Sequence, residues 1–202
     1  MEPITGKIAN RQIINRVAQS DLVVFNLEDL WDNRPVAEFD IAPFLFREMI
    51  LREKDFRTAM KTYDWAQYAD HHVAVFCSAD AIIPTWAWML AASKLESVAR
   101  SVALGRAQDL IRDHFARALE STDWSSYEGK PVVVKGCGSG IVPPAAYLLA
   151  TTKLQQVAAK LMYGEPCSSV PLWRKPREIS RPAAAKKASD AHPLPGNARR
   201  AP

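Results

Sequence analysis

The sequence predicts an α/β protein with a mostly parallel sheet flanked by helices, built from one supersecondary unit used twice. Residues 64–105 and 123–164 align at an offset of 59 without a gap, and 15 of the 42 aligned positions are identical. In each copy, a short β-branched run precedes a helical segment and a second short run. Strands alternating with helices favour right-handed βαβ units and a parallel sheet covered on both faces. We expect repeat units at about 46–104 and 105–163, related by pseudo-twofold symmetry.

The identical positions gather in short motifs. An aromatic turn opens each copy, an Ile-x-Pro motif precedes each helix, and a Lys-Leu-x-x-Val-Ala motif ends it. The paired motifs are Asp64-Trp65-x-x-Tyr68 with Asp123-Trp124-x-x-Tyr127, Ile82-x-Pro84 with Ile141-x-Pro143, and Lys94-Leu95-x-x-Val98-Ala99 with Lys153-Leu154-x-x-Val157-Ala158.

Four elements are expected before residue 64. The apolar spacing of residues 7–18 predicts a short helix, and residues 22–27 form a strand-like run. Residues 36–41 alternate between apolar and polar side chains, so the two runs are expected to pair as a hairpin or to lie as two edge strands. Residues 43–61 carry one apolar face and predict a helix.

Within the copies, strands are expected at 72–76 and 131–135, helices at 84–99 and 143–159, and short strands at 100–104 and 160–163. A helix over 106–120 links the two copies. Pro84 and Pro143 suit the first turn of a helix, where the missing N–H costs no hydrogen bond.

The chain divides into a body and a tail. With 202 residues, 48% of them hydrophobic, the chain can bury a sizeable core, and we expect a single α/β domain over residues 1–173. Residues 174–202 hold eight Lys or Arg against two acidic residues, together with five prolines and an Ala-rich stretch. This composition predicts a disordered basic tail, for which we expect no specific nucleic-acid partner.

Three features predict a cytoplasmic, reduced protein. No apolar run reaches the roughly 18 residues that a membrane helix needs, so no membrane association is expected. The N-terminus lacks the basic and then apolar layout of a signal peptide. The three cysteines are an odd number, and their spacing does not match a secreted disulfide framework.

The strongest candidates for chemistry are Cys77, Cys137 and Cys167, each of which follows a predicted strand. In one parallel sheet all three would emerge at the carboxyl ends of the strands, where such sheets bind ligands. Three thiolates at one edge suit a zinc ion or an iron–sulfur cluster, with Asp80 or Glu165 supplying or orienting a fourth position.

Two other interpretations stay open. In the first, Cys77 or Cys137 at a helix N-terminus acts as a nucleophile or sulfur carrier, which makes the protein a thiol enzyme. In the second, the cysteines are buried small hydrophobes and the chain is a non-catalytic partner-binding module. His71 and His72 precede their strand, away from Cys77, and are not expected to be ligands. No Ser/His/Asp set is evident in the sequence.

Four longer strings together resemble an uncharacterised bacterial family catalogued as domain of unknown function 2480. They are Ile50-Leu-Arg-Glu-Lys-Asp-Phe-Arg57, Cys77-Ser-Ala-Asp-Ala-Ile-Ile-Pro-Thr-Trp-Ala-Trp-Met89, Val134-Lys-Gly-Cys137 and Gly164-Glu-Pro-Cys-Ser-Ser-Val-Pro171. The resemblance spans roughly residues 10–176 and implies no activity. It implies that the three cysteine turns belong to the family pattern, although the glycine-rich stretch after Cys137 departs from it.

Members of this family tend to be encoded beside the machinery that assembles iron–sulfur clusters. The resemblance therefore implies an accessory protein in iron–sulfur cluster biogenesis that binds a metal ion or a cluster, with iron–sulfur assembly proteins as partners.

Overall fold

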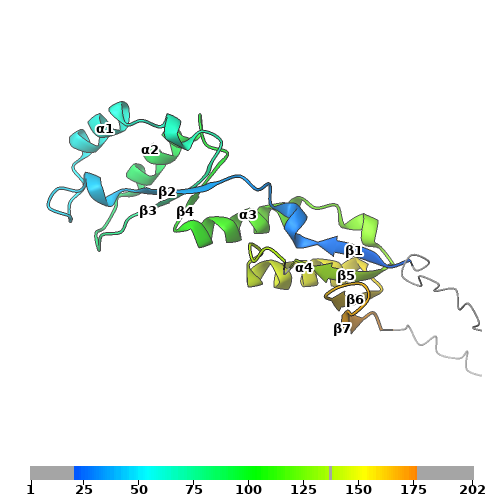
Figure 1. Ribbon diagram of the computed structural model, residues 1–202. Helices are drawn as coiled ribbons and strands as arrows, with labels where there is room; N and C mark the ends of the chain where they lie inside the picture. Colours follow the sequence, from blue (N-terminus) through cyan, green and yellow to red (C-terminus); the bar gives the residue numbers. More distant parts are fainter. Residues whose placement is uncertain (1–20, 137, 177–202) are drawn as a thin grey trace, which may run out of the picture.

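The computed structural model describes residues 21–136 and 138–176, which form two sheets placed one after the other along an elongated molecule (Figure 1). The three-stranded sheet has the order β2-β3-β4, and the four-stranded sheet has the order β1-β5-β6-β7. All neighbouring strands are parallel except β6 and β7. The strands are β1 (Val23–Asn26), β2 (Val36–Asp40), β3 (His72–Phe76), β4 (Ser101–Leu104), β5 (Pro131–Lys135), β6 (Lys160–Tyr163) and β7 (Val170–Arg174).

Four α-helices flank the sheets in the described residues. They are α1 (Glu53–Thr62), α2 (Thr85–Leu95), α3 (Ala107–Ser121) and α4 (Pro144–Val157). Four 3₁₀ turns complete the described elements: η1 (Leu27–Leu30), η2 (Ala42–Phe44), η3 (Ala66–Tyr68) and η4 (Trp124–Tyr127). None of these helices is long and apolar enough to cross a membrane.

The α/β class and the mostly parallel strand pairing are confirmed, but the expectation of a single sheet is wrong. The first two strands do not form a hairpin: β1 pairs with β5 and β2 pairs with β3, each as an edge strand of a different sheet. The alternating pattern of a strand shows which face is buried but not which strand lies beside it. Local pattern alone therefore does not decide between one sheet and two.

Corresponding elements recur at the offset of 59 residues. Strands β3 and β5, strands β4 and β6, and helices α2 and α4 all begin at equivalent positions. The indole N–H of Trp65 donates to the carbonyl of Met60 at 3.0 Å, and that of Trp124 donates to the carbonyl of Leu119 at 3.2 Å. Matching backbone bonds run from Gly105 N–H to Val75 O and from Gly164 N–H to Val134 O. The sequence similarity is thus accompanied by the same local contacts.

Helix α3 connects the two sheets through one hydrophobic core. Leu110, Phe115 and Leu119 of α3 are fully buried. They belong to a cluster that includes Ala74 and Ala103 of the three-stranded sheet, and also Val132 and Leu161 of the four-stranded sheet. A second cluster fills the space between α1, α2 and the three-stranded sheet, around Phe39, Phe56 and Leu95.

Two local expectations differ from the structure. The helix predicted over 43–61 begins at Glu53, because the chain first forms η2 and then a turn in which Arg47 and Glu48 have positive φ angles of 52° and 61°. Strand β7 was not predicted; it contains Pro171 and lies at a sheet edge, where proline is tolerated. The predicted helix at 7–18 and most of the predicted tail lie outside the described residues.

Candidate functional sites

The turn after β3 holds the first predicted ligands. Cys77 is half-buried and its thiol donates to the carbonyl of Ala79 at 3.5 Å, while Asp80 is exposed. Asp40 of β2 closes the turn by accepting hydrogen bonds from the backbone N–H of Ser78 at 3.0 Å and its hydroxyl at 2.5 Å. Burial raises the pKa of Asp40, but the hydrogen bonds from Ser78 and Ala42 outweigh it and lower the pKa below its usual value.

The turn after β6 holds the second group. Cys167 is exposed, and Glu165 forms an ion pair with Lys135 of β5 at 3.1 Å. Lys135 thus already partners the carboxylate that was predicted to approach a metal. Neither Cys77 nor Cys167 is part of a disulfide.

The predicted ligands do not share one sheet edge. Cys77 and Asp80 follow β3 of the three-stranded sheet, whereas Glu165 and Cys167 follow β6 of the four-stranded sheet. Cys137 lies outside the described residues. Within residues 21–136 and 138–176, no three His, Cys, Asp or Glu side chains are grouped so as to hold a metal ion. The three cysteines were expected to meet because they were expected to follow strands of one sheet. Cys77 follows a strand of the other sheet, so that expectation is wrong for Cys77. Metal or cluster binding stays a prediction.

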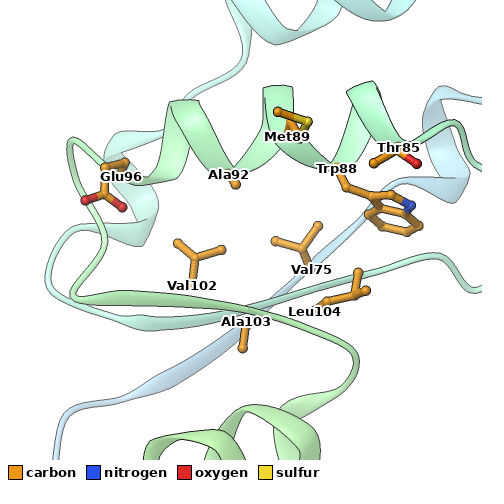
Figure 2. Close-up of a pocket in the computed structure, with 9 residues that line it drawn as sticks. All are labelled: Val75, Thr85, Trp88, Met89, Ala92, Glu96, Val102, Ala103 and Leu104. Carbon is orange, nitrogen blue, oxygen red and sulfur yellow. The ribbon is translucent and has the colours of Figure 1, made fainter. Parts of the chain in front are cut away.

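A groove of about 430 Å³ lies between α2 and the strands β3 and β4 (Figure 2). The side chains of Val75, Val102 and Leu104 point from the strands toward the helix, and Trp88 and Met89 belong to the facing α2. Met89 is 67% exposed and Leu104 is 63% exposed. The groove is therefore a mostly apolar surface that the described residues leave open to solvent.

Strand β4 borders this groove and is an edge strand. Its neighbour on one side is β3, and no described strand pairs with its other side. Gly105 N–H donates back to Val75 O of β3. Because N–H groups alternate in direction along a strand, those of Val102 and Leu104 point away from β3. These backbone groups are available for an added strand.

The strand at the equivalent position 59 residues later, β6, is covered. Strand β6 pairs with β7 in the antiparallel direction, with Trp173 opposite Leu161 and Val170 opposite Tyr163. Leu161 is fully buried, and Trp173 packs against the same hydrophobic cluster. Val102, the counterpart of Leu161, is only half-buried. The edges at β4 and β6 thus differ by one strand and one indole ring.

A second candidate site joins Asp32, His72 and Ser101. His72 is 1% exposed, its Nε2 lies 2.8 Å from Asp32 Oδ1 and its Nδ1 lies 2.7 Å from Ser101 Oγ. The chain before β2 supplies the aspartate, and the first residues of β3 and β4 supply the other two. The expectation that the chain has no Ser/His/Asp set is wrong: parallel strands bring together residues that share no sequence spacing.

Positively charged groups surround the carboxylate of this site. Arg34 binds Asp32 at 2.7 Å and also Asp70 at 2.8 Å, and Arg100 lies 3.7 Å from Asp32. Burial raises the pKa of Asp32, but the hydrogen bonds from His72 and Arg34 outweigh that effect and hold the pKa well below the usual aspartate value. Asp32 is therefore ionised at neutral pH.

The site opens into a cavity of about 260 Å³ beside α3. Arg100 and Arg117 contribute positive charge to its wall, and His114 and Ser121 contribute further polar groups. His114 Nε2 donates to the carbonyl of Leu30 at 2.8 Å, and its ring lies against Trp31. The cavity thus combines an ordered polar triad with two guanidinium groups.

Comparison with curated proteins and with solved structures found no match. A family model described as "Protein of unknown function (DUF2480)" matches residues 11–175, which is most of the chain and includes all three cysteines, the groove and the Asp32–His72–Ser101 site. The chain belongs to the DUF2480 family.

Proposed function

We propose that this chain is a cytoplasmic accessory protein that docks an extended segment of a partner protein as an added strand on the free edge of β4. The observation that carries the proposal is the difference between the two units: β7 covers β6, whereas no described strand covers β4. Iron–sulfur assembly proteins, the partner class implied by the family resemblance, are the first candidates to test.

The correspondence between the units specifies what the docked segment looks like. It runs antiparallel to β4, as β7 does to β6, and bonds to the outward backbone groups of Val102 and Leu104. A large apolar side chain opposite Val102 enters the groove between α2 and β4, in the position that Trp173 takes opposite Leu161. Binding covers the exposed parts of Met89 and Leu104.

The interpretation of the units as a tandem duplication rests on the shared offset of element starts and hydrogen bonds. The pseudo-twofold relation between them stays a prediction, which superposition of the two units in an experimental structure tests.

The direct test uses strand β7 itself as the probe. A fluorescent peptide of residues 168–176 is titrated with the full chain, and fluorescence anisotropy gives the dissociation constant. We expect a value between about 10 and 500 μM, because a single short strand buries less area than a stable complex needs. The same peptide with Trp173→Ala should bind at least about tenfold more weakly, since the groove then stays unfilled.

A matched pair of protein variants distinguishes backbone pairing of the peptide with β4 from hydrophobic contact of the peptide with the groove. Leu104→Pro removes an N–H that faces away from β3, so the sheet keeps its own hydrogen bonds but loses a docking donor. Leu104→Ala removes the side chain and keeps that donor. Binding should be lost in Leu104→Pro and only weakened in Leu104→Ala. No binding at millimolar peptide, or equal binding by both variants, would contradict the proposal.

Metal or cluster binding by cysteine thiolates is the second candidate function, supported by thiols at Cys77 and Cys167 that are free of disulfides. Zinc, iron and sulfide are measured in protein purified anaerobically without a His-tag. Equal loss of bound metal in the Cys77→Ser, Cys137→Ser and Cys167→Ser variants supports a site shared by all three cysteines. A metal-free protein in which one variant alone loses thiol reactivity supports the thiol enzyme or sulfur carrier instead.

A further inference from the structure

With a neutral His72 ring, one arrangement of hydrogens satisfies all three partners of the Asp32–His72–Ser101 site. Ionised Asp32 can only accept hydrogen bonds, so the His72 Nε2 that lies 2.8 Å from it carries the proton. In the neutral ring, Nδ1 then has a free lone pair. Ser101 Oγ lies 2.7 Å from Nδ1 and donates its hydroxyl hydrogen to it. This is the order of a carboxylate, an imidazole base and a hydroxyl nucleophile, with the two ring nitrogens exchanged relative to serine proteases.

The fold itself does not require this triad. At the offset of 59, Pro131 stands in place of His72 and Lys160 in place of Ser101, yet β5 and β6 pair in the same parallel register as β3 and β4. The unit therefore forms without a histidine or a serine at these positions. The buried histidine and its two partners are specific to the first unit, which favours a role beyond holding the strands together.

The cavity next to Ser101 suits a small anionic molecule. Its wall holds two guanidinium groups, of Arg100 and Arg117, against one carboxylate, of Asp32, and its volume of about 260 Å³ suits a small ligand. Guanidinium groups bind carboxylates and phosphates in a planar, paired geometry. They also stabilise negative charge that develops on an oxygen during acyl transfer.

We propose that Ser101 is the nucleophile of an esterase site, and that the site accepts small esters or thioesters whose acyl group carries a carboxylate or phosphate. His72 is the general base, Asp32 is a positioning residue that fixes the tautomer of His72, and Arg100 and Arg117 bind the anionic group. This proposal does not depend on strand docking at β4.

The reaction balances without an added cofactor. Ser101 Oγ forms a bond to the acyl carbon, its proton moves to His72 Nδ1, and the bond to the leaving oxygen or sulfur breaks as that atom takes the proton. Water then attacks the acyl carbon and gives a proton to Nδ1, the bond to Oγ breaks, and Oγ takes the proton back. The net result is one ester and one water converted into an acid and an alcohol or thiol.

The first experiment labels the full chain with a fluorophosphonate and locates the label by peptide mass spectrometry. We expect one label per chain on Ser101, absent in Ser101→Ala and unchanged in Ser93→Ala, whose hydroxyl donates to Leu90 O on α2. Asp32→Asn keeps the shape of the side chain but reverses the preferred tautomer, and should slow labelling about 100-fold or more. Circular dichroism confirms that each variant is folded. Absence of label on Ser101, or an unchanged rate in folded Asp32→Asn, overturns the proposal.

The second experiment tests the substrate class. Hydrolysis of 4-nitrophenyl succinate, which carries a free carboxylate, is compared with that of 4-nitrophenyl acetate. The succinate ester should have the higher kcat/KM, and Arg117→Gln should remove that preference through KM while Ser101→Ala removes turnover of both esters. Equal kcat/KM values for the two esters, or turnover that survives Ser101→Ala, contradict the assignment.

Discussion

His72 is a buried polar residue on β3, and the equivalent position 59 residues later, on β5, is Pro131. Among residues 21–136 and 138–176, it is the one polar residue that is buried, and both of its ring nitrogens have partners. A buried imidazole without partners would cost free energy, so Asp32 and Ser101 stabilise the fold as well as serving the proposed chemistry. Changes at these residues must therefore be tested for stability and for reactivity separately.

The low pKa of Asp32 predicts a specific dependence of stability on pH. A carboxyl whose folded pKa lies below its unfolded value of about 3.9 stabilises the protein above that pH, and this contribution falls as the pH drops toward the folded value. Asp32→Asn should lower the free energy of unfolding by about 1–3 kcal/mol at pH 7. The variant should also lose less stability than the wild type between pH 5 and pH 3. Urea denaturation at these pH values measures both effects, and parallel pH profiles would show that Asp32 is not the group responsible.

The positive φ angles of Gly105 and Gly129 predict that alanine at either position lowers the stability of the protein, and lowers it more at Gly105. Gly105 has φ of 114°, and an added Cβ would lie 2.5 Å from Asp109 Oδ2, whereas Gly129 has φ of 68° and nothing within 4 Å. Gly105→Ala should destabilise the protein by about 3 kcal/mol or more, since it adds a clash to backbone strain. Gly129→Ala should cost about 1–2 kcal/mol. Thermal unfolding of the two variants ranks them, and a larger cost at Gly129 would contradict the predicted order.

At the residue scale, the sequence identified chemically capable side chains but not which of them meet. Asp32, His72 and Ser101 are 40 and 29 residues apart, and no local motif joins them. The one available signal was a histidine opening a run of apolar strand residues. Cys77 and Cys167 were expected to meet because both follow strands, but a shared edge also requires a shared sheet.

At the element scale, local pattern was sufficient to place the strands whose consecutive residues are buried. The predicted bounds of β3, β5 and β6 agree with the structure, because continuous apolar runs between polar turns mark buried parallel strands. The pattern failed where a special backbone intervenes. Residues 43–52 contain a proline and two non-glycine residues with positive φ, and their apolar side chains imitate a helix face without forming one.

The stability that β7 adds at the edge of β6 indicates what a docked strand would add at the edge of β4. Trp173 lies opposite fully buried Leu161, while the neighbouring Leu172 is 54% exposed. Trp173→Ala should lower the free energy of unfolding by about 2–3 kcal/mol, and Leu172→Ala by less than about 0.5 kcal/mol. Urea denaturation provides the comparison. Similar losses of unfolding free energy in the two variants would show that packing of the Trp173 indole does not stabilise the edge of β6.

At the scale of the whole molecule, one core belongs to both sheets. Helix α3 contributes Leu110, Phe115 and Leu119 to a cluster that contains residues of β3 and β4 as well as β5 and β6. The sequence predicted this linking helix, but it could not predict two sheets. Strand order depends on contacts between residues far apart in the chain, which local periodicity does not report.

The shared core predicts that the two sheets unfold together. Phe115→Ala should cost about 3–5 kcal/mol and should lower the midpoint of unfolding equally for both sheets. Phe56→Ala, in the separate cluster beside α1, removes an equally buried ring and serves as the matched variant. Residue-resolved NMR intensities during urea denaturation report each sheet. Two separate transitions in the wild type would contradict a single cooperative unit.

The most direct measurement of strand docking is residue-resolved hydrogen exchange of β4, with and without the peptide of residues 168–176. In the free chain, the amides of Val102 and Leu104 should exchange fast, while those of Leu161 and Tyr163, opposite β7, are protected. Saturating peptide should protect Val102 and Leu104. If these two amides are already protected in the free chain, or stay unprotected with peptide bound, β4 does not accept an added strand and the proposed function is wrong.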